Sequence, residues 1–267
     1  MIDRRRLHPY RVAQGLIRRI SEMRYAREWD THESALRSKS FLRTLKNQYA
    51  GKRLFLIANG PSIKNMDLSV LKNEYTMCMN RFYIYFDKIG FIPTFFVCVE
   101  DLVLSQFAED FNQIPIEAKF VNWRMHKEIQ QSFYLKESFA LNPFFQTDLT
   151  QPTHFGGTVT FACLQLAYHM GFTQVILIGL DHNFKEKGLA NKVEVRSYEK
   201  DESHFDPNYF PKGMKWRLPD LTKSEIGYAL ARDFYQKNGR DIFDATINGH
   251  CQIFPKVDFQ QLIRQTV

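Results

Sequence analysis

The chain has 267 residues, of which 44% are hydrophobic and 24% are charged, a globular composition that excludes a disordered or fibrous protein. At about 150 residues per domain, this length predicts one large domain or two small ones. The longest apolar runs, such as Val175–Leu180, have six or seven residues. That is far short of the ~20 residues that a membrane-spanning helix needs, so we expect none.

The formal charge of +7 is concentrated at one end of the chain. Residues 1–50 hold twelve Lys and Arg against five Asp and Glu, and the remaining residues hold 24 of each sign. An enzyme of nucleic acids usually lines its working surface with positive charge. The neutral body therefore argues against a nucleic-acid partner. No apolar stretch of signal-peptide length follows the positive N-terminus, so we expect a cytoplasmic protein.

Residues 1–50 are predicted to form a basic helical extension. Apolar residues recur every three to five positions over residues 7–29, with arginines between them, and this spacing predicts an amphipathic helix. A second helix is predicted over residues 33–49. A basic amphipathic helix can lie on an anionic membrane, which would place residues 1–30 at the inner face of the cell membrane. Packing on the body or pairing of subunits in a homo-oligomer fits the same pattern.

From residue 51 the chain alternates between strand-like and helix-like segments, which predicts a second domain of the α/β class over residues 51–267. Apolar runs of the buried-strand type lie at residues 53–58, 75–79, 94–99 and, more weakly, 118–121. A short helix is expected at about residues 66–72. Residues 124–153 are aromatic and irregular, and we assign no element to them.

The clearest unit begins at Gly156-Gly-Thr158, which opens a predicted helix running to Met170. Gly171 suits the left-handed position that ends a helix. A buried strand over residues 174–180 follows and stops at Asp181. A helix followed by a strand of this type indicates a parallel sheet. We therefore predict a Rossmann-like, mostly parallel sheet flanked by helices.

Residues 183–220 are polar with little periodicity, and a segment of this kind is usually a functional lid. Its aromatic residues could stack on sugar or base rings, or could anchor an ordered lid. These residues are Tyr198, Phe205, Tyr209, Phe210 and Trp216. A long helix is then predicted over residues 222–236, with Thr222 as N-cap and Glu225 completing a capping box. A strand at 241–243 and a helix at 258–265 complete the chain.

Polar and small residues follow the predicted strands, where open α/β sheets bind their ligands. They include Asn59-Gly-Pro-Ser62, Asn80, Glu100 and Asp181. Ser62 offers an amide at the start of a helix, which suits a phosphate, and Asn80 can both donate and accept hydrogen bonds. The same tetrapeptide also fits an ordinary turn without a ligand. It matches neither the Walker loop nor the dinucleotide fingerprint.

Histidines and acidic residues supply the candidates for proton transfer. His182 follows a strand, and Asp201, Glu202 and His204 lie in the predicted lid. Histidine is the default general base, although a single loop histidine is more often only solvated. These residues lack the spacing of a metal motif, so we predict no metal site. The four cysteines form no C-x-x-C pair, so we expect neither a disulfide framework nor a zinc site. Three of them lie in apolar segments, where a free cysteine behaves as a small hydrophobe.

Two blocks of the sequence resemble known families. The stretch Leu56-Ile-Ala-Asn-Gly-Pro-Ser-Ile-Lys-Asn-Met-Asp67, followed by Met79-Asn-Arg-Phe-Tyr83, resembles the opening of bacterial sialyltransferases of glycosyltransferase family 42. Residues 156–181 resemble the second signature of that family. Both blocks are also similar to the MptE-like superfamily (domain of unknown function 115), whose members often end in a segment matched here by Ile253–Phe259. The resemblance covers about residues 52–260.

The sialyltransferase resemblance implies a single-domain fold of the GT-A-variant type, a CMP-activated nonulosonic sugar (sialic acid or Kdo-like) as donor, and no cofactor or metal. It implies that the nucleotide and donor sugar contact Asn59, Gly60, Pro61, Ser62, Asn80, Glu100, Gly156, Gly157, Thr158, Gly179 and Asp181. It also implies that His204 is the general base and that Tyr209 and Tyr198 assist departure of the phosphate. The family has its histidine a few residues further on, and an asparagine where this chain has Glu100.

Three functions follow as hypotheses. The first is a glycosyltransferase that modifies a surface glycan or a lipid-linked acceptor, as in lipopolysaccharide biosynthesis. The MptE-like resemblance implies instead a diphosphokinase that transfers pyrophosphate from ATP to a pterin alcohol. That enzyme would use Mg²⁺, for which Glu100, Asp101 and Asp181 are candidate ligands. The third hypothesis is a scaffold that keeps the nucleotide-binding fold without catalysis.

Overall fold

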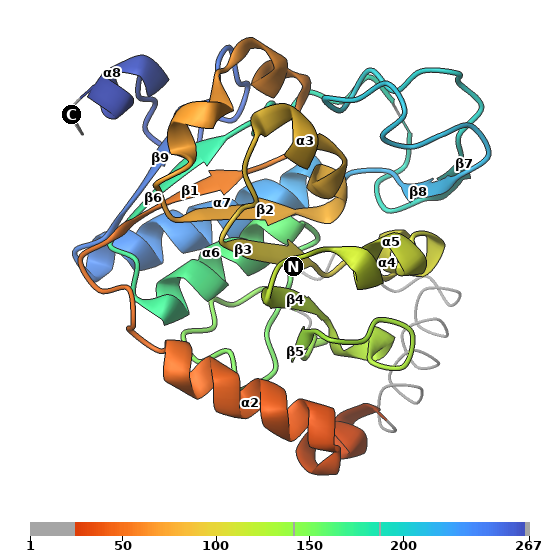
Figure 1. Ribbon diagram of the computed structural model, residues 1–267, viewed down its shortest axis with the longest axis vertical. Coiled ribbons are helices and arrows are strands. Elements are labelled where there is room, and N and C mark those ends of the chain that lie inside the picture. Colours follow the sequence, from red (N-terminus) through yellow and green to blue (C-terminus); the bar gives the residue numbers. More distant parts are fainter. Residues whose placement is uncertain (1–24, 141, 187, 265–267) are drawn as a thin grey trace, which may run out of the picture.

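A seven-stranded parallel sheet forms the centre of the protein (Figure 1). The computed structural model describes residues 25–140, 142–186 and 188–264. The strand order is β5-β4-β3-β2-β1-β6-β9. The strands are β1 (Arg53–Ile57), β2 (Thr76–Met79), β3 (Phe95–Cys98), β4 (Ala118–Asn122), β5 (Phe133–Leu135), β6 (Gln174–Ile178) and β9 (Asp241–Asp244). This sheet confirms the Rossmann-like α/β prediction.

Helices cover both faces of the sheet (Figure 1). They are α2 (Glu33–Leu45), α3 (Phe86–Ile89), α4 (Asp101–Gln106), α5 (Ala108–Gln113), α6 (Val159–Met170), α7 (Leu221–Lys237) and α8 (Phe259–Arg264). The described residues also form short 3₁₀ helices, namely η2 (Pro61–Asn65), η3 (Leu68–Leu71), η4 (Asn80–Tyr85) and η5 (Trp123–Met125).

The apolar strands divide the core into two layers, because successive side chains of a strand point to opposite faces. In β1, Leu54 and Leu56 pack with the residues of α6 and α7, whereas Phe55 and Ile57 pack with those of α3, α4, α5 and α8. All four side chains are fully buried. This two-sided burial explains why β1 reads as a continuous apolar run rather than as an alternating one.

Helix α6 lies against the centre of the sheet, and its ends are fixed by the residues that the sequence indicated. The Thr158 side chain accepts a hydrogen bond from the Thr160 N–H and caps the helix. Gly171 ends it in the left-handed conformation, with φ of 94°. A Cβ at Gly171 would also lie 2.7 Å from the Asn47 Cα. Glycine is therefore required here both for its positive φ and for the close approach of the Asn47 backbone.

Residues 183–220, which we call the lid, differ from the loop that the sequence predicted. They contain a two-stranded antiparallel hairpin of β7 (Val193–Val195) and β8 (Lys215–Arg217), set apart from the main sheet (Figure 1). Phe205, Tyr209, Phe210 and Trp216 are buried and anchor the lid in the core layer on the α3–α5 side. The fifth aromatic residue, Tyr198, is exposed.

Several boundaries of the predicted elements change. The expected single helix at residues 66–72 is replaced by η2 and η3, and β5 arises in the stretch to which no element was assigned. Thr222 was wrong as the N-cap of α7: the helix begins one residue earlier, and the Asp220 side chain accepts from the Lys223 N–H. The prediction failed because Asp and Thr are both good caps, two residues apart.

The structure describes only part of the predicted N-terminal helices. Residues 25–31 are helical, and residues 1–24, which carry most of the predicted basic helix, lie outside the described residues. The four cysteines are free, as predicted, and all four are buried, one more than the apolar context of the sequence indicated. Among the described residues, no helix is both long and apolar enough to cross a bilayer.

Candidate functional site

A cavity of about 650 Å³ opens at the carboxyl ends of β1, β2, β3 and β6 and extends under the lid. Strand β1 lies between β2 and β6, so the chain leaves the sheet in opposite directions on the two sides of this point. Open α/β sheets bind ligands at such a switch point. The volume is within the range of small-molecule sites. The fold therefore places the candidate site where the strand-end motifs meet.

The turn after β1 is held by Asp181, which follows β6. The Asp181 carboxylate accepts hydrogen bonds from the Ser62 N–H at 3.1 Å and from the Ser62 hydroxyl at 2.6 Å. Gly60 lies so close that a Cβ there would collide with this carboxylate and lie 2.6 Å from the Gly179 carbonyl oxygen. Burial raises the pKa of Asp181, and the Ser62 hydrogen bonds oppose the rise. The Ser62 donors expected to face a phosphate thus face Asp181.

Two asparagines at neighbouring strand ends line the cavity. The Asn59 amide donates to the Met79 carbonyl oxygen, which fixes its orientation, and leaves its Oδ1 buried. Asn80 has a left-handed backbone, with φ of 52°. Within the described part of the chain, neither Oδ1 has a hydrogen-bond partner. Buried acceptors without partners are costly, so both atoms suit a ligand that donates hydrogen bonds.

Glu100 and Asp101 form an acidic pair after β3. Glu100 caps α4, and the Arg217 guanidinium of β8 lies 3.3 Å from Glu100 and 3.6 Å from Asp101. Burial raises the pKa of Glu100 to about 7, with Arg217 opposing the rise and Asp101 adding to it. The described residues hold no group of three metal-ligating side chains. A metal here would take its other ligands from a substrate, as Mg²⁺ does with nucleotides.

The amino end of α6 forms the opposite wall of the cavity. Gly156 and Gly157 both have positive φ, and a Cβ at Gly157 would lie 2.9 Å from the Lys223 Cδ. The stem of Lys223 from α7 therefore lies against this helix end. A helix amino terminus and an ammonium group both attract anions. The sequence pointed to the glycines, but Lys223 was missed because it is 66 positions away.

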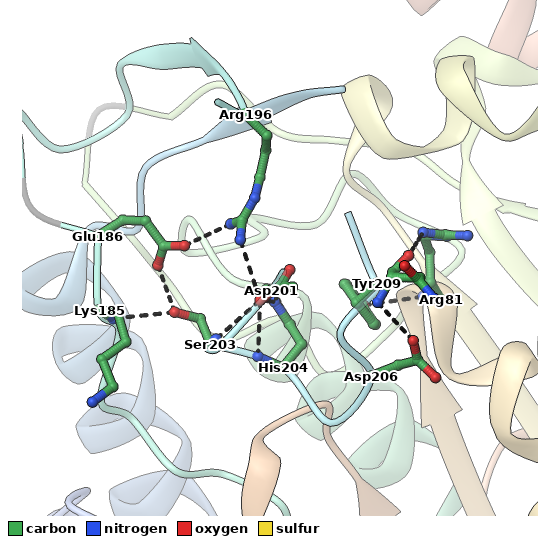
Figure 2. A network of polar contacts seen from close by, with 10 residues as sticks. Arg81, Lys185, Glu186, Arg196, Asp201, Ser203, His204, Asp206 and Tyr209 are labelled. Atoms are coloured by element: carbon green, nitrogen blue, oxygen red, sulfur yellow. Dashed lines mark hydrogen bonds and ion pairs between the residues drawn. The ribbon is translucent and has the colours of Figure 1, made fainter. Parts of the chain in front are cut away.

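His204 is the lid residue best placed for proton transfer (Figure 2). Its Nδ1 lies 3.1 and 3.0 Å from the two carboxylate oxygens of Asp201, whose side chain is fully buried. Its ring stacks on Tyr209, with centroids 4.0 Å apart and planes at 3°, and lines the cavity. Burial acts to raise the pKa of Asp201, but the hydrogen bond and charge of His204 and the charge of Arg196 lower it. An Nδ1–H held by Asp201 leaves Nε2 as the basic nitrogen.

The two tyrosines expected to assist departure of the phosphate do not reach the cavity, although Tyr209 stacks on His204. The buried Tyr209 hydroxyl accepts a hydrogen bond from the Arg81 N–H at 3.1 Å, and burial raises the pKa of this phenol. Tyr198 is 63% exposed. Neither lines the cavity, so among the three predicted catalytic residues only His204 reaches it.

A second histidine–carboxylate pair, which the sequence did not predict, includes His182, another residue that lines the cavity. The His182 Nε2 is 3.0 Å from a carboxylate oxygen of Glu225 on α7. Glu225 had been expected to complete a capping box. The His182 backbone is left-handed, with φ of 54°, which is uncommon outside glycine and is often found at functional sites.

The structure brings most of the predicted binding residues together. Those that line the cavity are Asn59, Gly60, Asn80, Glu100, Gly156, Gly157, Thr158, Gly179 and Asp181. Pro61 and Ser62 lie next to it, in the turn that Asp181 holds.

A comparison with known families matches the part of the chain that builds the floor of this cavity. The model of a family described as 6-hydroxymethylpterin diphosphokinase MptE-like matches residues 31–187, more than half of the chain. No curated protein matches the chain. The matched range contains the strand ends and the amino end of α6, and it stops before His204. The resemblance to sialyltransferases stays a prediction.

Proposed function

The chain belongs to the MptE-like family, and from that premise we propose that it is a diphosphokinase, a transferase that moves a pyrophosphoryl group from ATP to the hydroxyl of a small alcohol such as a pterin. One observation supports this function most directly. A single cavity holds an anion-attracting wall at α6, two acidic side chains after β3 and a histidine backed by a buried carboxylate. The wall and the acidic pair supply the charges that phosphoryl transfer depends on, and the histidine can orient the attacking hydroxyl and accept its proton.

The triphosphate is proposed to lie along the amino end of α6, with Lys223 beside it. The positive end of a helix dipole and a nearby ammonium both favour phosphate oxygens. Glu100 and Asp101 fit Mg²⁺, because two neighbouring carboxylates supply the oxygen ligands that this ion prefers. Burial raises the pKa of Glu100 and the charge of Asp101 adds to the rise, and a dication would relieve that repulsion. Bound Mg²⁺ would neutralise charge on the transferred phosphates.

The proposed reaction places His204 as general base. Its Nε2 takes the proton of the alcohol while the alcohol oxygen attacks the β-phosphorus of ATP. The bond from that phosphorus to the oxygen bridging to the α-phosphate breaks, and AMP leaves. Asp201 keeps the imidazole in the required tautomer and stabilises the imidazolium that forms. A base of this kind typically contributes 10²–10⁴-fold to the rate.

Nucleotide binding tests this function first. We expect ATP with Mg²⁺ to raise the melting temperature of the full chain, since a ligand at 100 times its Kd adds about 2.7 kcal/mol. ATP with EDTA should have a much smaller effect, and replacing both Glu100 and Asp101 by their amides should abolish the metal-dependent part. Transfer is then followed by ³¹P NMR with a hydroxymethylpterin. Stabilisation by CMP without metal, and none by ATP, would refute the diphosphokinase.

A CMP-sugar glycosyltransferase is the second candidate, and the Asp201–His204 pair favours it. Phosphoryl transfer depends mainly on positioning and charge, whereas displacement at a sugar carbon by a neutral hydroxyl calls for a defined base. In that reaction the acceptor oxygen would bond to the anomeric carbon, and CMP would leave. Stabilisation by CMP in EDTA would support it. A response to none of these nucleotides would instead favour a non-catalytic scaffold.

A further inference from the structure

Behind His204 the lid contains a buried ionic cluster, formed by Glu186, Arg196, Asp201 and His204 (Figure 2). The Arg196 guanidinium lies 2.6 Å from Glu186 and 3.5 Å from Asp201, and Asp201 contacts His204 at 3.0 Å. The side chains are 11%, 1%, 0% and 12% exposed, in the order given. Charges this deeply buried interact strongly, because water screens them poorly.

The charges of this cluster balance only in one state of His204. Two carboxylates face one guanidinium, so a neutral imidazole leaves the cluster with one unpaired negative charge. A proton on His204 removes that charge. Burying an uncompensated charge is costly. The protonated state of His204 is therefore the one in which the charges of the cluster balance.

The surroundings of the cluster supply no other nearby compensating charge among the contacts of the described residues. The Ser203 hydroxyl donates to Glu186, and the Lys185 backbone N–H donates to Ser203. The Lys185 ammonium points away from the cluster (Figure 2). Arg196 also lies over the Trp216 ring, at 5.3 Å.

The other face of His204 is aromatic. Tyr209 stacks on the imidazole, and the rings of Phe184, Phe210 and Trp216 meet its edges. Arg81 reaches this side only through Tyr209, with its guanidinium 5.7 Å from the tyrosine ring. The charges that act most directly on His204 are thus those of Asp201, Arg196 and Glu186.

We propose that Glu186 and Arg196 are positioning residues that set how strongly His204 binds a proton, with Glu186 strengthening and Arg196 weakening it. Arg196 extends β7 by one residue, and its backbone pairs with Gly213 and Met214 next to β8. The position of the Arg196 charge, and with it proton binding by His204, therefore depends on the pairing of β7 with β8. Its relevance to catalysis rests on the proposed role of His204 as general base. The effect on proton binding by His204 can be measured without any substrate.

The test is an NMR titration of the His204 imidazole nitrogens in the ligand-free full chain, assigned with His204→Gln. In Glu186→Gln, His204 should take up its proton at a pH lower by about one unit, because a negative charge is lost. In Arg196→Gln, the uptake should move about as far to higher pH, because a positive charge is lost. Arg196→Lys keeps the charge and should titrate close to the wild type, which controls for a folding defect in Arg196→Gln.

The exposed pair Glu199 and Lys212 on the same lid provides the matched control. Their side chains are 76% and 58% exposed and lie at 2.5 Å. Glu199→Gln and Lys212→Gln make the same charge changes in water and should leave the titration unchanged. Shifts in the same direction for Glu186→Gln and Arg196→Gln, or no shift, would overturn the proposal. Opposite shifts without any transfer activity would support it and refute the proposed function instead.

Discussion

The floor and the lid of the cavity are built on different principles. The floor consists of strand ends fixed by backbone geometry: Gly60 permits the close approach of Asp181, which in turn holds Ser62. The lid is fixed by side chains, with buried aromatic anchors around the pair of Asp201 and His204. The floor is therefore a rigid surface of backbone and strand-end side chains, and the lid places a histidine–carboxylate pair at the same cavity.

The largest effect should come from breaking the floor with Gly60→Ala. The new Cβ would collide with the Asp181 carboxylate and the Gly179 carbonyl oxygen, and backbone cannot move aside without disturbing β1 and β6. We expect a loss of about 3 kcal/mol or more in the free energy of unfolding, measured by urea denaturation. Gly213→Ala in the lid is the control: φ is 88° but the space is open, so the loss should be about 1 kcal/mol. Equal losses of unfolding free energy in the two variants would show that the floor is no less tolerant of a Cβ than the lid.

A substitution in the lid should abolish most of the turnover while the chain still folds. His204→Gln is expected to lower turnover about 100-fold or more, because the proposed general base is lost, while the chain stays folded at the assay temperature. Turnover is measured under the nucleotide conditions that the binding assay identifies. His250→Gln, an exposed histidine outside the cavity, is the control and should keep full turnover. Full turnover in His204→Gln would show that His204 is not the general base.

Tyr209→Phe separates an anchor from a catalytic group. The substitution keeps the ring that stacks on His204 and leaves the Arg81 N–H without its acceptor. We expect a loss of about 1–2 kcal/mol in stability, from thermal denaturation, and turnover within a few-fold of the wild type. A 100-fold fall in turnover would instead support the phosphate-assisting role that the sialyltransferase resemblance implies.

The smallest effect concerns Glu100, where floor and lid meet through Arg217. Its pKa is raised to about 7, so the folded state binds a proton that the unfolded state has released between about pH 4.5 and 7. Wild-type stability should therefore fall as pH rises through this window. Glu100→Gln should be more stable than the wild type at pH 8, and the difference should shrink at pH 5. A difference that does not vary with pH would show that Glu100 ionises freely.

The sequence was most informative where local chemistry decides the structure. The apolar run of β1, the Thr158 cap and the closing Gly171 each fix an element through neighbouring residues, so sheet and helix could be predicted. The strand-end motifs located the cavity for the same reason, because carboxyl ends of parallel strands meet at one edge. The capping box at Thr222 failed because a competing cap stands two residues away.

By itself, the sequence determined the α/β class, the strand ends that form the floor and the candidacy of His204. Only the tertiary structure decided which side chains contact one another at the site. It turned the Ser62 donors towards Asp181, kept Tyr209 out of the cavity lining, brought Lys223 to the cavity, and paired Glu225 with His182. Backbone preferences act within a few residues and can be read along the chain. Contacts between residues far apart in sequence depend on the packing of the whole domain.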